Sequence, residues 1–285
     1  FWVMEQQYSL LDMKGTVPVE DVASEARNRP LRIFTLGRFT LVSDGTPLRY
    51  SRKAPSKPLL LLKALIAAGG RQVAGSSLAA MLWPDNDGDR AQQAFDTTLH
   101  RLRKYLGDDR YLIMEDGRVT LNSELVWVDV WSFERSVSAL QRQLQHGAAT
   151  QSMEHVVGHM ENMLRSYQGH FLSRDETTCW SVSLQERLRS KYIHCIIELG
   201  SFWEHHGLWS KAIFCYQKGI EVDDLIETFY QRLMVCYRET GRRSEAIATY
   251  RQCQRILSVV LALEPTAETR SIYQTLLAQQ HHNAG

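Results

Sequence analysis

Residues 89–107 read DRAQQAFDTTLHRLRKYLG, and residues 111–121, YLIMEDGRVTL, follow shortly afterwards. At 100° per residue, the first stretch forms an amphipathic helix with one narrow apolar stripe. This stripe consists of Ala91, Phe95, Leu99, Leu102 and Leu106. In the second stretch, Asp116-Gly117 separates two short extended runs, a sequence that favours a type I′ turn. The two stretches therefore predict a long helix followed by a tight two-stranded hairpin.

The helix face opposite the apolar stripe is polar. Its members are Gln93, Asp96, Thr97, His100, Arg101 and Lys104, with Arg90 near the start and Arg103 at the flank. Gln can pair with adenine, Arg with guanine or phosphate, and Thr can contact a thymine methyl group or a phosphate. With a rise of 1.5 Å per residue the helix is roughly 25 Å long, enough to lie across a DNA groove. The same pattern also fits an ordinary solvated helix face.

Two shorter helices are predicted before the polar helix. The first, PLLLLKALIAA, follows an N-cap at Ser56, has Pro58 in its first turn and ends at Gly69-Gly70. The second begins at a Ser76-Ser77 cap and runs through LAAMLW to Pro84. Three helices followed by a hairpin are the order of a winged helix-turn-helix, whose third helix enters the major groove of DNA.

Short extended runs come before these helices. LRIFTL, FTLVS and PLRY lie within residues 31–50, and Asp44-Gly45 favours a hairpin turn. They predict three short antiparallel strands. In the later hairpin, Arg118 lies beside the predicted turn, where it could reach a phosphate or simply be a solvated turn residue.

Length and composition are those of an ordinary globular protein. The 285 residues, 44% of them hydrophobic and 23% charged, suggest about two domains. The sequence has no apolar run long enough to span a bilayer and no secretory signal, so no membrane association is expected. The five cysteines include no Cys-x-x-Cys pair, which argues against a disulfide framework or zinc site. They predict buried free thiols in a reducing cytoplasm.

Positive charge is concentrated in one part of the chain. Residues 31–125 contain 14 Lys/Arg and 10 Asp/Glu, a net charge of +4. Residues 1–30 have a net charge of −2, and residues 126–285 a net charge of −1. The cationic part coincides with the predicted winged domain, as nucleic-acid binding requires. The excess is small, so tight DNA binding by a lone monomer is not expected.

From Trp131 onward the hydrophobic period is helical almost throughout. Helices are predicted near residues 132–145, 152–166, 176–205, 210–222, 225–240, 243–263 and 267–280. Gly207, Ser210, Ala212, Ile213 and Tyr216 recur 34 residues later as Gly241, Ser244, Ala246, Ile247 and Tyr250. This is the tetratricopeptide period. In the second copy Met234 stands where a glycine is usual, and such helical pairs bind partners or the rest of their own chain.

The sequence offers no catalytic motif. It has no Walker A sequence, no Gly-x-Ser-x-Gly, no His-Glu-x-x-His and no Gly-x-Gly-x-x-Gly, so no enzyme, cofactor or metal site is expected. His205-His206 are expected at a helix end before Gly207, because His favours that end of the helix dipole. Asp223-Asp224 and Glu227 are expected to cap a helix start, and Trp203 to lie in the core.

Two consecutive blocks resemble one known family. Residues 31–130 look like the OmpR-type winged-helix domain, with the motifs FTLGRFTLVSDGTPL, PLLLLKAL, LAAMLWPD and TTLHRLRKYLG. Residues 131–280 look like the bacterial transcriptional activator domain, with YQGHFL, DDLIETFYQRLM, YRETGRRSEAIATYRQC and LEPTAET. Together they resemble the SARP class of transcription activators, the Streptomyces antibiotic regulatory protein type.

The resemblance implies where DNA would be contacted. The third helix of the winged domain would read the major groove through Gln93, Thr97, His100, Arg101 and Lys104, with Arg103 beside them. The start of the first helix and the wing would touch phosphates through Arg52, Lys53, Lys57 and Arg118. The family's wing usually ends in Gly-Tyr-x-Leu, whereas this chain has Gly117-Arg-Val-Thr-Leu121. The resemblance also implies binding to double-stranded promoter DNA, self-association on direct repeats and contact with RNA polymerase holoenzyme.

We therefore predict a mainly α protein with a small β part. Residues 1–30 are expected to be a linker or the tail of an upstream region, since Gly15, Pro18 and Pro30 interrupt them. Residues 31–125 are the predicted winged helix-turn-helix DNA-binding domain, and residues 126–285 the predicted tetratricopeptide-like activator domain. Because the first residue is not Met, we expect the output part of a larger regulator.

The predicted function is sequence-specific DNA binding that activates transcription, in the cytoplasm and associated with the nucleoid. The alternative is a protein-interaction or signalling module whose winged domain does not bind DNA. The small net charge and the altered wing motivate this alternative.

Overall fold

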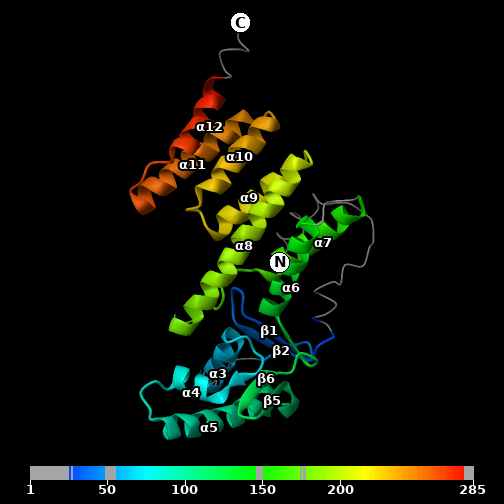
Figure 1. Cartoon of the computed structure of the whole chain (residues 1–285), viewed down its shortest axis with the longest axis vertical. Helices are drawn as coiled ribbons and strands as arrows, with labels where there is room; N and C mark the ends of the chain where they lie inside the picture. Colours follow the sequence, from blue (N-terminus) through cyan, green and yellow to red (C-terminus); the bar gives the residue numbers. More distant parts are fainter. Residues whose placement is uncertain are drawn as a thin grey trace. The chain divides into compact units, whose positions relative to one another are not determined.

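The structure, a computed structural model, describes residues 26, 28–48, 56–145, 150–173, 175 and 178–278. Two compact units make up the chain. The first runs to Gln168 and includes Leu172–Asp175, and the second consists of Gly169–Phe171 and the chain from Glu176 onward. Figure 1 shows a mainly helical protein with a small β part, as predicted from the sequence.

The first unit combines short strands with five α-helices among its described residues. In chain order, its elements are β1 (Leu31–Phe34), β2 (Thr40–Ser43), β3 (Thr46–Pro47), α3 (Ser56–Ala67), β4 (Val73–Ala74), α4 (Gly75–Leu82), α5 (Gly88–Leu106), the 3₁₀ turn η2 (Asp109–Tyr111), β5 (Leu112–Glu115), β6 (Arg118–Leu121), β7 (Val126–Val128), α6 (Asp129–Gln145) and α7 (Thr150–Ser166).

These strands form two sheets. The order of the first sheet is β3-β2-β1-β7, with β2 antiparallel to both β1 and β3, as predicted. Strand β7 pairs in parallel with β1, so Leu31 lies opposite Val126. The second sheet has the order β4-β6-β5. The sequence did not predict β4 or β7, because strands of two or three residues have too short a pattern to separate from loops.

Helices α3, α4 and α5 pack together as the three-helix core of a winged helix-turn-helix. All five residues of the predicted apolar stripe of α5 are buried. Asp87 caps the helix start by accepting from the Arg90 backbone N–H at 3.0 Å, and Gly107, with φ of 87°, ends it. The three-helix arrangement and the extent of α5 are therefore confirmed.

The start of α4 differs from the prediction. The helix begins at Gly75, and no side chain caps it, so the Ser76-Ser77 cap is wrong. The Gly75 backbone N–H instead donates to the Gly117 carbonyl of the hairpin at 2.8 Å. A Cβ at Gly75 would lie 2.9 Å from the Phe95 ring, so only glycine allows this close approach. The hairpin fixes the helix start, a long-range effect that the local sequence does not show.

Asp129 joins the first sheet to α6 through a buried carboxylate. Its Oδ2 accepts the backbone N–H groups of Thr35 at 2.6 Å and Leu36 at 2.7 Å. Its Oδ1 accepts the Thr35 hydroxyl at 2.7 Å and the Val130 N–H at 2.8 Å. Burial raises the pKa of Asp129 to about 6, although the four donors oppose this shift.

We expect this carboxyl group to make stability depend on pH. Because its pKa is raised from 3.8 to about 6, the folded chain holds the proton more tightly than the unfolded chain. The contribution to the free energy of unfolding is therefore full below about pH 4 and is lost as the pH rises to about 6. Urea unfolding between pH 4.5 and 7 compares the wild type with Asp129→Asn. The free energy of unfolding of the wild type minus that of the variant should fall as the pH rises. If this signed value rose with pH, the raised pKa would be contradicted.

The second unit is helical. Its helices are α8 (Cys179–His205), α9 (Trp209–Val222), α10 (Glu227–Glu239), α11 (Arg243–Leu261) and α12 (Ala267–Ala278). Each of the first four packs against the next one along the chain, which is the arrangement of stacked helical pairs. The predicted helices are confirmed to within a few residues. Thr178 and Ser181 form a capping box at the start of α8, which was not predicted from the sequence. His205 and His206 lie at the end of this helix, as predicted.

The two predicted repeats pack differently at their small-residue position. In the first, a Cβ at Gly200 would overlap the Tyr216 ring, so glycine lets the aromatic side chain fill the seam between α8 and α9. In the second, buried Met234 occupies the place of the glycine. Tyr250, which corresponds to Tyr216, stacks instead on Tyr273 with ring centroids 3.9 Å apart.

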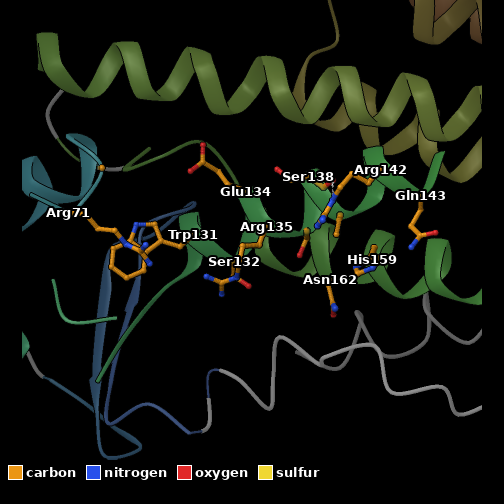
Figure 2. A pocket seen from close by; sticks show the side chains of 13 residues that line it. Arg71, Trp131, Ser132, Glu134, Arg135, Ser138, Arg142, Gln143, His159 and Asn162 are labelled. Atoms are coloured by element: carbon orange, nitrogen blue, oxygen red, sulfur yellow. Dashed lines mark hydrogen bonds between the residues drawn. The ribbon is translucent and has the colours of Figure 1, made fainter. Parts of the chain in front are cut away.

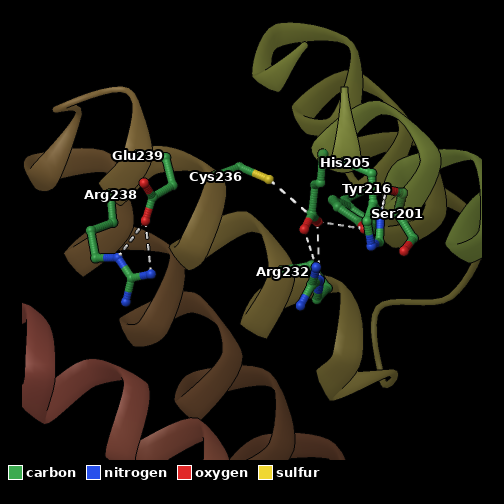
Figure 3. Close-up of polar contacts among 8 residues, drawn as sticks. Ser201, His205, Tyr216, Arg232, Cys236, Arg238 and Glu239 are labelled. Carbon is green, nitrogen blue, oxygen red and sulfur yellow. Dashed lines mark hydrogen bonds and ion pairs between the residues drawn. The ribbon is translucent and has the colours of Figure 1, made fainter. Parts of the chain in front are cut away.

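A buried polar network joins three helices of the second unit (Figure 3). The Glu204 carboxylate of α8 accepts the Tyr216 hydroxyl at 2.7 Å and Arg232 Nε at 3.0 Å. The thiol of Cys236 lies 3.6 Å from the same carboxylate. Arg232 Nη2 also pairs with Glu204 Oε2, which makes a two-point ion pair. The network fixes α8, α9 and α10 to one another.

Two acidic residues that were predicted to lie at a helix start also bind residues distant in the sequence. Asp223 is buried and pairs with Arg189 of α8, in addition to accepting the Leu225 N–H at 3.1 Å. Glu227 is the first residue of α10 and accepts the Thr266 N–H, at 2.9 Å, from the segment before α12. The prediction that acids lie at this helix start is confirmed for Glu227, although no side chain caps α10, and both acids also tie together elements distant in the sequence.

Four of the five free cysteines are buried, but Cys179 is exposed, so the prediction of buried thiols fails for that residue. Burial raises the thiol pKa of Cys215, Cys236 and Cys253 to about 12. Since the thiolate is the reactive form, we expect a maleimide reagent to label the native chain at Cys179 alone. Mass spectrometry of the digested product checks this, and rapid native labelling at Cys215 would contradict the structure.

Within the described ranges, no helix is both long and apolar enough to cross a membrane. The same residues include no group of three or more His, Cys, Asp or Glu side chains that could hold a metal ion.

Candidate nucleic-acid interface

The residues predicted to contact DNA bases lie together on the outward face of α5, which we call its reading face. Gln93, Thr97, His100, Arg101 and Lys104 are all exposed. Gln93, Thr97 and Arg101 follow one another at spacings of four residues and Lys104 comes three residues later, so these side chains lie one above another, with His100 beside Arg101. Because the opposite face is buried against α3 and α4, this is the face of α5 that a groove could receive.

Within this face, hydrogen bonds limit what each side chain can offer. The Thr97 hydroxyl donates to the Gln93 backbone carbonyl at 2.9 Å, which leaves its methyl group and its lone pairs for an outside partner. Asp96 accepts Gln92 Nε2 at 3.1 Å, a bond along the helix that engages its carboxylate. The exposed donors are therefore the Gln93 amide and the cations further along the helix.

Arg103 lies to the side of this face. Its Nη2 donates to the Leu112 carbonyl at 3.0 Å, and its Nε is buried. The guanidinium thus holds the first strand of the hairpin against α5. This geometry favours a role for Arg103 in positioning the hairpin over a role in contacting DNA.

The start of α3 presents a positive charge. Lys57 is exposed in the first turn, and its Nζ lies 5.6 Å from the centroid of the Trp83 ring. The N-terminus of a helix attracts anions through its unpaired N–H groups and its dipole. This end of α3 therefore suits a phosphate. Arg52 and Lys53, also predicted as phosphate contacts, lie outside the described residues.

The hairpin has the predicted turn. Asp116 and Gly117 have φ of 47° and 71°, as a type I′ turn requires, and β5 pairs with β6 in antiparallel. Arg118 is exposed beside the turn, and its Nη1 donates to the Gln72 carbonyl at 3.0 Å. A guanidinium has five N–H donors, so this bond leaves others for a phosphate.

The loop between α3 and β4 contributes to this surface, although the sequence suggested only a helix stop there. Its Gly70 carbonyl accepts the Leu121 N–H of β6, and its Gln72 N–H donates to the Thr120 hydroxyl, both at 2.8 Å. Gly70 has φ of 72°, and a Cβ there would lie 2.6 Å from the Trp131 ring. The Gly69-Gly70 pair could have indicated such a close approach, but the partner is distant in the sequence.

Known proteins match this chain over both of its units. The family model described as Bacterial transcriptional activator domain matches residues 128–277. The regulatory protein AfsR of Streptomyces griseus is 24% identical over 241 residues, which are 83% of this chain and 23% of AfsR. The chain thus spans less than a quarter of the length of this curated relative.

A solved structure of Mycobacterium tuberculosis EmbR, in complex with a low affinity phosphopeptide, has the same fold. Its TM-score is 0.62 at 20% sequence identity, over 88% of this chain and 66% of that chain. The predicted fold class is therefore confirmed.

Proposed function

Because the chain belongs to the bacterial transcriptional activator domain family, we propose that it is a sequence-specific DNA-binding transcription regulator. Its winged helix-turn-helix domain and activator domain have the architecture of the SARP class of regulators. The observation that carries the proposal is the exposed polar face of α5, where Gln93, Thr97 and Arg101 lie together. These are residue types that read base edges.

In this proposal α5 lies in the major groove of double-stranded promoter DNA. Gln93 would pair with adenine, Thr97 would contact a thymine methyl group, and Arg101 would bind the acceptor edge of guanine. His100 and Lys104 would contact the flanking phosphates or bases. Phosphate contacts position the protein without reading sequence. Lys57, Arg118 and the two preceding cations, Arg52 and Lys53, suit that role.

Activation would require a contact with RNA polymerase holoenzyme in the cytoplasm. The net charge of +4 over residues 31–125 is small for one DNA-binding domain. Two copies side by side on a direct repeat would double the phosphate contacts and thus the electrostatic term in the binding free energy. We therefore propose that two copies bind side by side on direct repeats and contact each other there.

Replacing Lys57 should weaken binding to every DNA sequence alike. Each phosphate contact contributes about −0.9 to the slope of log K against log salt concentration. Lys57→Ala removes one contact per copy, so the slope should become less negative by about 0.9 for each bound copy. Fluorescence anisotropy across a salt series measures this slope. Lys218→Ala, a change at an ion pair with Glu221 in the second unit, is the matched control and should leave the slope unchanged. An unchanged slope in Lys57→Ala would remove α3 from the interface.

The decisive experiment is enrichment of genomic DNA fragments by the purified chain, followed by sequencing. A recurring motif, especially a direct repeat spaced by about one helical turn, is the expected result. Binding that depends steeply on salt but has no sequence motif would contradict sequence reading by α5. If no fragment binds even at low salt, the protein-interaction module becomes the better explanation.

A further inference from the structure

A groove of about 1030 Å³ follows α6 within the first unit. Figure 2 shows Arg71 and Trp131 at one end of this α6 groove, and Arg142, Gln143 and His159 toward the other. Small-molecule sites occupy roughly 300–1,000 Å³, so the volume matches the upper end of that range. The groove lies away from the reading face of α5, because its lining residues come from the α3–β4 loop, α6 and α7.

The chemistry of the α6 groove favours an anion. Among the described residues, its lining includes Arg71, Arg135 and Arg142 and one acidic side chain, Glu134. Trp131, Arg135, Ser138 and Arg142 follow one another at spacings of four, three and four residues, and so lie along one face of α6. Guanidinium groups bind phosphate in a bidentate manner.

Helix α7 contributes neutral polar groups to the same groove. Burial lowers the pKa of His159, and the charge of Arg142 acts in the same direction, which favours the neutral imidazole. Asn162 supplies an amide from the next turn. A neutral imidazole and an amide provide both hydrogen-bond donors and acceptors, which suits the hydroxyl groups of a sugar.

One end of the groove offers a planar platform. The Arg71 guanidinium lies 5.7 Å from the centroid of the Trp131 ring. Planar guanidinium groups and indole rings both stack on flat aromatic ligands such as nucleobases. From Trp131 to Arg142, α6 rises by about 16 Å, a span longer than inorganic phosphate and suited to a ring joined to a phosphate chain.

We propose that the α6 groove binds a nucleoside phosphate, with the base against Arg71 and Trp131 and the phosphates against Arg135 and Arg142. The site would connect to the wing, which is the β5–β6 hairpin, through the loop between α3 and β4 that contains Arg71. The next residue, Gln72, accepts Arg118 through its carbonyl at 3.0 Å, and Gly70 accepts the Leu121 N–H at 2.8 Å. A ligand that moves Arg71 would thus shift the wing, and this regulatory part rests on the proposed DNA-binding function.

Calorimetric titration of the full chain with ATP, GTP, CTP and UTP tests the site. Tripolyphosphate and the nucleoside of each nucleotide, titrated separately, represent the two halves of the ligand. At least one nucleotide should bind more tightly than either half. The double change Arg135→Gln and Arg142→Gln should weaken that binding at least tenfold, since phosphate loses two guanidinium partners. Ser138→Tyr, which fills the groove without a change of charge, should do the same.

Arg165→Gln is the matched control, because Arg165 is an exposed arginine of α7 outside the groove that pairs with Glu161. Circular dichroism checks that every variant is folded. Absence of binding by all four nucleotides would overturn the site. Equal affinity for tripolyphosphate and nucleotides would overturn the base platform, and equal loss in Arg165→Gln would mean a diffuse charge effect.

A second readout separates this site from the proposed function. The nucleotide that binds should change the affinity for a target DNA at least threefold in the wild type, and Arg71→Ala should remove that change. Unchanged DNA affinity would overturn the link to the wing but not the groove. Nucleotide binding without any DNA binding would contradict the proposed function alone, whereas DNA binding without nucleotide binding would contradict the groove alone.

Discussion

A triple change of Gln93→Ala, Thr97→Ala and Arg101→Ala is expected to abolish discrimination between target and random DNA. Each good contact with a base edge contributes on the order of 1–3 kcal/mol of discrimination. Three such losses should therefore weaken binding to the target at least a hundredfold. Since all three side chains are exposed, the fold should remain intact.

Competition anisotropy between the selected target and random duplex measures this discrimination. The matched control is a triple alanine variant at Gln252, Arg255 and Ser258, which are exposed on α11 of the second unit. This control should bind the target as the wild type does. Residual binding of the α5 variant should still depend on salt, because Lys57 and Arg118 remain. If the α5 variant kept its preference for the target, α5 would not be the reading helix.

Arg232→Ala is expected to destabilise the second unit by about 2–4 kcal/mol, because removal of one partner leaves a buried charge unpaired. The Glu204 side chain is only 6% exposed, whereas that of Arg232 is 38% exposed, so water reduces the effect below that of a fully buried pair. Burial and the adjacent Glu204 also raise the pKa of Tyr216, which keeps its hydroxyl as a donor to the carboxylate.

Figure 3 also shows the matched control, Arg238, which pairs with Glu239 on the surface of the same helix. Arg238→Ala should cost less than about 1 kcal/mol, as exposed pairs do. Urea unfolding followed by tryptophan fluorescence compares the two variants. Adding Glu204→Gln to Arg232→Ala should recover much of the loss, because it removes the orphaned charge. Equal effects of the two arginine changes would show that the network does not hold the helices together.

The helices were predictable because their information is local. A buried stripe at every third and fourth residue in α5, an N-cap and a C-terminal glycine are all contained in one short stretch. The 34-residue offset between Tyr216 and Tyr250 likewise follows from the sequence alone. The exposed face of α5 could be predicted for the same reason, since burying Phe95 and Leu102 sends Thr97 and Arg101 outward.

The division into compact units depended on distant partners. Helices α6 and α7 lie in the first compact unit, whereas the predicted activator domain covers residues 126–285 and the family model residues 128–277. The parallel pairing of β7 with β1 and the bonds of Asp129 to Thr35 and Leu36 attach the start of α6 to the winged domain. Neither contact leaves a periodic pattern in the chain.

The sequence by itself determined which segments are helices, where the hairpin turns and which side of α5 faces outward. Hydrophobic period and turn residues act over a few residues and can be recognised without knowing the partner. The start of α4 could not be recognised in this way, because the hairpin fixes it. Only the tertiary structure decided that Arg103 turns to the Leu112 carbonyl, that Gly70 receives Trp131 and that three arginines from two segments line one groove. These outcomes depend on packing between elements far apart in the chain. The geometry of such a contact is set by the surfaces of both elements, whereas a local sequence pattern describes the surface of only one of them.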